Sequence, residues 1–126
     1  MIITSPLKIP VSAKKSFSLN LNQYRNTHFL VLNKAKNNYS DLMLPKIQEI
    51  EPMEQVELFY TLYPATRHKQ DIMNVCSIVD KFFCDVLVKG GVIPDDTYEQ
   101  IPKTHYSFGE IDKENPRVEI EIRKLK

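Results

Sequence analysis

The strongest constraint on the fold is a change in the spacing of apolar residues on the two sides of Pro64. From Gln55 to Tyr63 both alternating faces are largely apolar, which predicts a strand in the centre of a sheet. From Asp71 onward, apolar residues recur every three or four positions and lie within roughly 140° of arc, which predicts an amphipathic helix. A strand that leads into such a helix requires a fold in which helices pack on a sheet.

Both ends of the predicted helix carry local signals. Asp71 suits its start, because a carboxylate there accepts hydrogen bonds from free amides and faces the positive end of the helix dipole. Gly90-Gly91 suits its end. Residues 92–96, with the sequence Val-Ile-Pro-Asp-Asp, are expected to form a turn.

The first part of the chain gives weaker signals. Residues 1–15 carry no apolar period and are expected to be irregular or strand-like. Apolar and polar residues alternate over 17–22, which predicts a half-buried strand. Residues 29–49 have near-helical spacing, and we expect Pro45 to kink or break the final turn of that helix.

The last part of the chain predicts two strands, 98–111 and 117–123, paired as a hairpin. The expected order is therefore strand, helix, strand, helix, strand, strand. This order indicates an α+β fold, with one mixed β-sheet and two helices packed on it. We find no repeat and no linker, so residues 1–126 are expected to form a single domain.

Composition limits the class of protein. The chain has 126 residues, of which 42% are hydrophobic and 26% charged, which supports one packed core. It has no apolar run near the ~18 residues of a membrane span and no signal-peptide stretch, so we expect a cytoplasmic protein without a membrane partner. Cys76 and Cys84 are eight residues apart on the predicted helix, about 12 Å, which favours two buried reduced thiols over a disulfide.

The charges are unevenly distributed along the chain. Residues 1–46 contain seven Lys and Arg and one acidic residue, whereas residues 47–126 contain ten basic and fifteen acidic residues. Such a division can present a basic surface to a polyanion. The alternative is that folding mixes the two halves and leaves no basic patch.

A group of carboxylates surrounds the predicted second helix. Asp71 begins it, Asn74 lies one turn further on the same side, and Asp95 and Asp96 lie in the turn that follows it. These oxygen ligands suit Mg²⁺ or Mn²⁺, provided that the turn runs back toward Asp71. A divalent ion beside the basic residues 67–69 fits phosphodiester hydrolysis. The alternative is that Asp71 only caps the helix and the Asp-Asp pair only forms a turn.

These motifs together resemble the RusA family of Holliday-junction resolvases. The family typically has a basic run, Asp-x-Asp-Asn at a helix start, a glycine at the helix end and an Asp-Asp turn. Here the matching segments are Arg67–Asn74 and Gly90–Asp96, followed by the closing strands. The similarity is best over residues 55–124. A less specific match near the N-terminus involves Asn20, Asn22, Tyr24 and Arg25.

The resemblance implies a small homodimeric endonuclease, common in phages and prophages, that serves DNA recombination and repair. It would bind four-way or branched DNA rather than a small molecule, and cut symmetrically with Mg²⁺, or with Mn²⁺. Asp71, Asp95 and Asp96 would bind the metal and, with Asn74, form the catalytic group. The expected DNA contacts are Arg67, Lys69, Lys81, Arg25, Lys14 and Lys15.

The sequence departs from the family pattern at two positions. Met73 replaces the second aspartate of the helix start and cannot ligate a hard cation, and Ser77 replaces a lysine. Lys81 lies within about 20° of Asn74 around the helix and is a candidate for the missing charge. Two alternatives therefore stay open: a module on the same fold that binds branched DNA without cutting it, and a protein-binding domain without nucleic acid.

Overall fold

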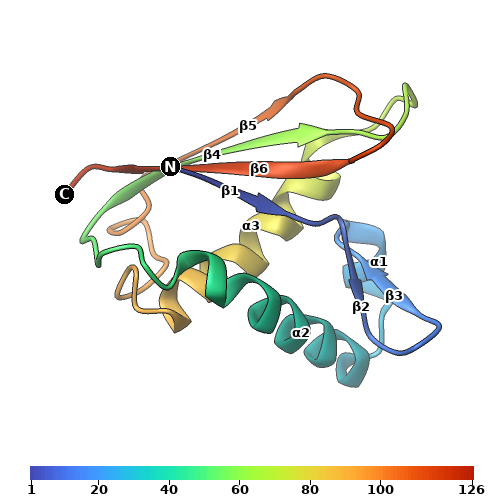
Figure 1. Ribbon diagram of the computed structural model, residues 1–126, viewed down its shortest axis with the longest axis horizontal. Coiled ribbons are helices and arrows are strands. Elements are labelled where there is room, and N and C mark those ends of the chain that lie inside the picture. The colour runs from blue at the N-terminus through green and yellow to red at the C-terminus, as the bar shows by residue number, and fades with distance from the viewer.

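A four-stranded mixed sheet covered by helices on one face forms the body of the molecule (Figure 1). The computed structural model describes residues 1–126. The strand order in the sheet is β1-β6-β4-β5, and β2 and β3 form a separate two-stranded sheet. The α+β class and the mixed sheet predicted from the sequence are confirmed. The elements are β1 Ile2–Ser5, β2 Lys8–Pro10, β3 Ser16–Ser18, α1 Leu21–Asn26, α2 Phe29–Ile47, β4 Val56–Tyr63, α3 Ile72–Lys89, β5 Lys103–Phe108 and β6 Arg117–Lys124.

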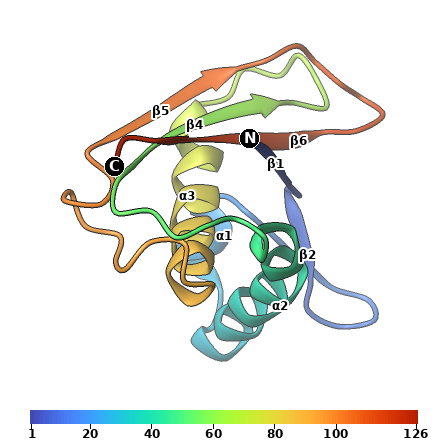
Figure 2. The ribbon, with the colours of Figure 1, turned by 60° about the vertical axis from the view of Figure 1, so that its left-hand side comes forward.

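Strand β4 is central, as its two apolar faces predicted. It pairs antiparallel with β6 and parallel with β5. Its alternate residues Val56, Leu58, Tyr60 and Leu62 are at most 1% exposed. Helices α2 and α3 lie side by side below the sheet in both views of the ribbon (Figure 2).

The predicted C-terminal hairpin is wrong. Strands β5 and β6 lie on opposite sides of β4, so that Phe59 of β4 has His105 as one neighbour and Glu121 as the other. The connection from β5 to β6 passes the end of β4, where the N–H of Asp112 donates to the carbonyl of Pro64 (2.8 Å). Apolar alternation shows which face of a strand is buried but not which strand it pairs with, and β4 offers the most apolar neighbour on both edges.

The N-terminal predictions need two corrections. The alternating segment is a strand only over Ser16–Ser18, because the Asn20 side chain accepts a hydrogen bond from the N–H of Gln23 (2.8 Å) and begins α1. The cap converts the polar residues that follow into a short helix. The helix predicted over 29–49 is confirmed as α2, but Pro45 does not break it and the helix continues to Ile47.

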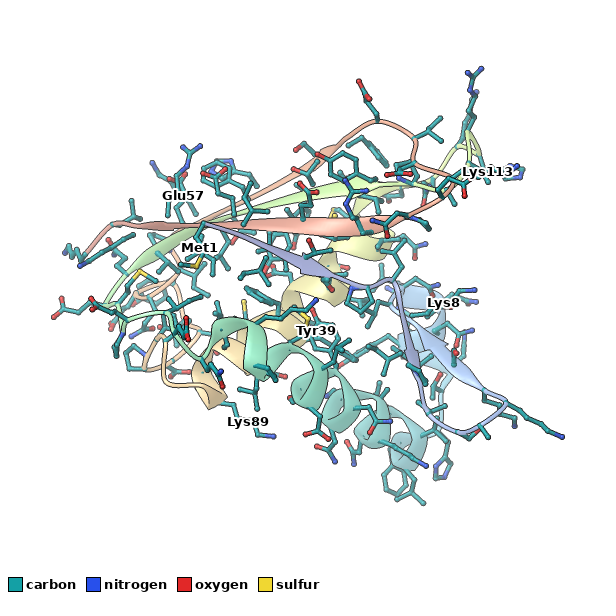
Figure 3. All side chains as sticks on the ribbon, in the orientation of Figure 1. Met1, Lys8, Tyr39, Glu57, Lys89 and Lys113 are labelled. Carbon is teal, nitrogen blue, oxygen red and sulfur yellow. The ribbon has the colours of Figure 1, made fainter.

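One hydrophobic core of 26 buried residues holds these elements together. Phe82 of α3 is near its centre: its ring stacks on Phe17 of β3 (5.8 Å between centroids) and meets Tyr39 of α2 edge-on (5.5 Å). Figure 3 shows Tyr39 in the layer between α2 and the sheet. Cys76 and Cys84 are buried free thiols, as predicted. None of the helices is sufficiently long and apolar to cross a membrane.

A carboxylate ties α3 to the sheet. Asp80 Oδ1 accepts hydrogen bonds from the Tyr60 hydroxyl (2.7 Å) and the Cys84 thiol (3.1 Å), and Oδ2 accepts one from the Tyr106 hydroxyl (2.8 Å). Burial, with the nearby charge of Asp80, raises the pKa of Tyr60, Cys84 and Tyr106. These three groups therefore stay protonated and act as donors to Asp80.

We predict that Asp80→Ala lowers the free energy of unfolding by about 2–3 kcal/mol, because the fully buried Tyr60 hydroxyl loses a charged acceptor. Urea unfolding measures this. In a Tyr60→Phe background the same substitution should cost at least about 1 kcal/mol less. Asp41→Ala, at an exposed carboxylate of α2 without a hydrogen bond, is the control and should change stability by less than about 0.5 kcal/mol. An equally small effect of Asp80→Ala would contradict the prediction.

We also predict slow thiol chemistry and loss of stability at alkaline pH. Burial, with a smaller effect of Asp80, raises the pKa of Cys76 from 9.0 to about 12. The folded state therefore favours the neutral Cys76 thiol. The contribution of this thiol to stability is complete below pH 9 and is lost between pH 9 and 12, because the unfolded chain ionises first. The free energy of unfolding should fall by up to about 1.4 kcal/mol per pH unit over this range. At pH 8, iodoacetamide should modify Cys76 at least ~100-fold more slowly in native than in urea-unfolded protein. Equal rates would show that the thiol is accessible and ordinary.

Candidate functional site

The segment between β4 and α3 is an exposed basic loop. Arg67, His68 and Lys69 are all exposed, and they line an open pocket of about 290 Å³ together with Phe108, Gly109 and Ile111 at the end of β5. The side chains of Arg67 and Lys69 form no ion pair or hydrogen bond within the chain. Their charges are thus available to an anionic ligand.

Further basic residues are carried at the same end of the molecule. Figure 1 shows the 64–71 segment, α1 and the β2–β3 connection all on the right-hand side, with the 64–71 segment beside the sheet and the β2–β3 connection below it on the helix side, and Figure 3 shows Lys8 and Lys113 on the same side. The β2–β3 connection carries Lys14 and Lys15, and the last turn of α1 carries Arg25; all three are exposed. Five of the six expected DNA contacts therefore lie at this end, which we call the basic end. It also carries acidic residues of the β5–β6 connection, among them Asp112.

Asp71 occupies the position predicted for it. It is the exposed N-cap of α3, and its Oδ1 accepts a hydrogen bond from the N–H of Met73 (3.0 Å). The second carboxylate oxygen has no partner within the chain. Met73, which replaces the family aspartate, is 55% exposed beside it. The cap role is therefore real, and it leaves one oxygen of Asp71 available for a ligand.

Asn74 has a structural contact that the sequence did not suggest. Its Oδ1 accepts a hydrogen bond from the N–H of Leu21 (3.2 Å), the first residue of α1. This bond joins the first turn of α3 to the helix that carries Arg25. Its side-chain nitrogen has no partner within the chain.

Asp95 and Asp96 lie beyond the other end of α3. The chain leaves the helix through Gly90 and Gly91, and is held there by the buried Val92 and Ile93. The N–H of Val92 donates to Leu87 (2.9 Å), and the N–H of Met53 donates to Val92 (2.7 Å). The Asp-Asp turn therefore stays at the C-terminal end of the helix.

The expected proximity of the carboxylates is not found within one chain. Helix α3 has 18 residues, which corresponds to about 27 Å between its ends. Asp71 caps the first end of α3. Asp96 lies nearer the other end, since its charge raises the pKa of Asp85, after the larger effect of burial. Lys36 and Lys81 lower the same pKa. No group of three His, Cys, Asp or Glu side chains is placed to hold a metal ion.

Lys81, the sixth expected DNA contact, and Asp80 also lie away from Asp71. Lys81 is exposed on α3, and its charge lowers the pKa of Asp85. Lys81 lies ten residues after Asp71, which is about 15 Å along the helix axis. Asp80 is not free to join a metal site, because both of its oxygens are occupied by Tyr60, Cys84 and Tyr106. The chain thus has a basic end, at which Asp71 has one free carboxylate oxygen, and a separate acidic turn.

Sequence reasoning missed a polar cavity between α2 and α3. It is lined by Lys36, Asn37, Ser40, Phe82, Asp85 and Lys89. The available signal was the one-turn spacing of Lys36 with Ser40 and of Asp85 with Lys89, which places each pair on one helix face.

No protein-family model matches the chain, and no curated protein matches it.

We predict that Asn74→Ala frees the start of α1. The N–H of Leu21 loses its only acceptor, so stability should fall by about 1–2 kcal/mol and this amide should exchange with solvent faster than in the wild type. Hydrogen exchange followed by NMR measures both effects. Asn74→Asp keeps the acceptor oxygen and is the matched control. Unchanged protection of Leu21 in Asn74→Ala would show that the bond does not hold α1.

Proposed function

We propose that this protein is a magnesium-dependent endonuclease that cuts branched DNA, the activity implied by its resemblance to the RusA family. One observation supports it most: an exposed helix cap, Asp71, with a free carboxylate oxygen directly follows an exposed basic loop whose Arg67 and Lys69 are unpaired. The proposal places the protein in the cytoplasm, where such DNA is found.

The basic end would bind the DNA backbone. Lys and Arg side chains contact phosphates and displace counterions, which gives affinity without base recognition and a strong dependence on salt. Arg67 and Lys69 would hold the phosphate nearest Asp71. Lys14, Lys15 and Arg25 would hold an adjacent part of the branched substrate.

The metal would require two copies of the chain. In one chain Asp71 lies at the start of α3 and the Asp95–Asp96 turn follows its end, and its own residues do not form a complete ligand set. A two-fold axis across the direction of α3 relates the start of one helix to the end of the other, and each copy would then complete the partner's site. A magnesium ion held there would polarise the scissile phosphate and lower the pKa of an attacking water.

The second candidate is a protein that binds branched DNA without cutting it. Met73 favours it, because a thioether is a poor ligand for magnesium and this side chain lies exposed beside Asp71. Binding without product at every Mg²⁺ or Mn²⁺ concentration would support this candidate. A third candidate, a protein-binding domain, requires junction binding that is absent or does not weaken with salt.

We predict that Asp71→Asn abolishes cleavage of a synthetic four-way junction, with a loss of at least ~100-fold, and leaves folding intact. Asparagine is as good a helix cap as aspartate, so stability should change by less than about 0.5 kcal/mol. The assay measures paired nicks with Mg²⁺. Asp41→Asn, at an exposed site on α2, is the control and should cut normally. Cleavage by Asp71→Asn at the wild-type rate would exclude the proposed site.

Mixing two inactive variants tests the shared site. Asp71→Asn and Asp96→Asn subunits, unfolded together and refolded, should recover single nicks, because mixed dimers contain one site with both aspartates. The two substitutions in one chain should not recover when mixed with themselves. No recovery on mixing, with each variant folded and dimeric, would show that the two aspartates act within one subunit or not at all.

A further inference from the structure

The cavity between α2 and α3 is built from polar side chains on an aromatic floor. Its volume is about 190 Å³, enough for several water molecules or a small ion. Lys36, Asn37 and Ser40 enter from α2, and Asp85 and Lys89 enter from α3. The buried ring of Phe82 closes it toward the core.

None of these five polar side chains forms an ion pair or a side-chain hydrogen bond within the protein. The chain's four ion pairs involve other residues, and no side-chain hydrogen bond includes any of the five. Ser40 is the clearest case, because its side chain lines the cavity while the residue is only 8% exposed. The other buried serine, Ser5, is bonded to the Tyr39 hydroxyl (2.8 Å). No buried side-chain nitrogen or oxygen lacks a partner, so the Ser40 hydroxyl oxygen reaches the cavity, where it is available to water or a ligand.

The charges favour an anion. Lys36 and Lys89 contribute two ammonium groups against the one carboxylate of Asp85. The Lys36 ammonium lies 5.7 Å from the centre of the Tyr24 ring, a contact that restrains the side chain. The Ser40 hydroxyl and the Asn37 amide add neutral donors.

The carboxylate decides between anions. A fully ionised tetrahedral anion such as sulfate would be repelled by Asp85, whereas a phosphate that retains a P–O–H group can donate a hydrogen bond to it. A DNA phosphodiester has no such hydrogen. We propose that this cavity binds a phosphate group bearing a P–O–H, either inorganic phosphate or a terminal phosphate monoester. The proposal does not depend on the endonuclease activity.

Calorimetric titration of the full chain with inorganic phosphate, at constant ionic strength, tests the proposal. The wild type should bind phosphate at least about tenfold more tightly than sulfate. Lys36→Met should weaken phosphate binding about tenfold and Ser40→Ala about threefold, for the loss of a charged and a neutral donor. Asp85→Asn should remove the preference for phosphate over sulfate, because the amide N–H group can donate a hydrogen bond to an oxygen of either anion.

Lys34→Met is the matched control, since this exposed lysine lies on the same helix outside the cavity, and its phosphate binding should equal that of the wild type. Circular dichroism melting confirms that each variant is folded. No phosphate binding by the wild type, equal binding of sulfate, or full binding by folded Lys36→Met and Ser40→Ala would overturn the proposal.

Competition distinguishes the two phosphate sources. A 5′-phosphorylated oligonucleotide that displaces inorganic phosphate, where its 5′-hydroxyl counterpart does not, identifies a DNA end as the ligand. Equal failure of both oligonucleotides identifies free phosphate.

Discussion

Helix α3 is the element on which the rest of the structure depends. Its buried face supplies much of the core, Phe82 joins it to α2 and β3, and Asp80 fastens it to β4 and β5 through three hydrogen bonds. Its two ends are held by the Asp71 cap and by the buried Val92. Because it is held along its length and at both ends, it keeps these ends about 27 Å apart.

This separation shapes the chemistry. One end combines a free carboxylate oxygen with unpaired basic side chains, and the other carries the Asp-Asp turn. Neither end alone has the ligands that a hard divalent ion requires. If the chain is a nuclease of the proposed kind, catalysis and dimerisation are a single requirement, and its two sites are coupled by the two-fold symmetry.

Several elements could be predicted because their causes are local. The central strand followed from two apolar faces, α3 from its apolar spacing, and its start from a capping carboxylate. The C-terminal hairpin was wrong because strand pairing depends on which edges are free after the core has formed. The N-terminal strand was cut short because one side chain, Asn20, began a helix within an alternating pattern.

The sequence by itself determined which residues are buried, where α3 begins and ends, and which side chains carry charge. These are properties of neighbours one turn or two positions apart. Only the tertiary structure decided which of those side chains meet. It separated Asp71 from Asp96, gave Asn74 a partner 53 residues away, and brought two lysines, a serine and an aspartate of different helices to one cavity. The reason is that these distances depend on how rigid elements pack, and the spacing of residues along the chain does not contain that information.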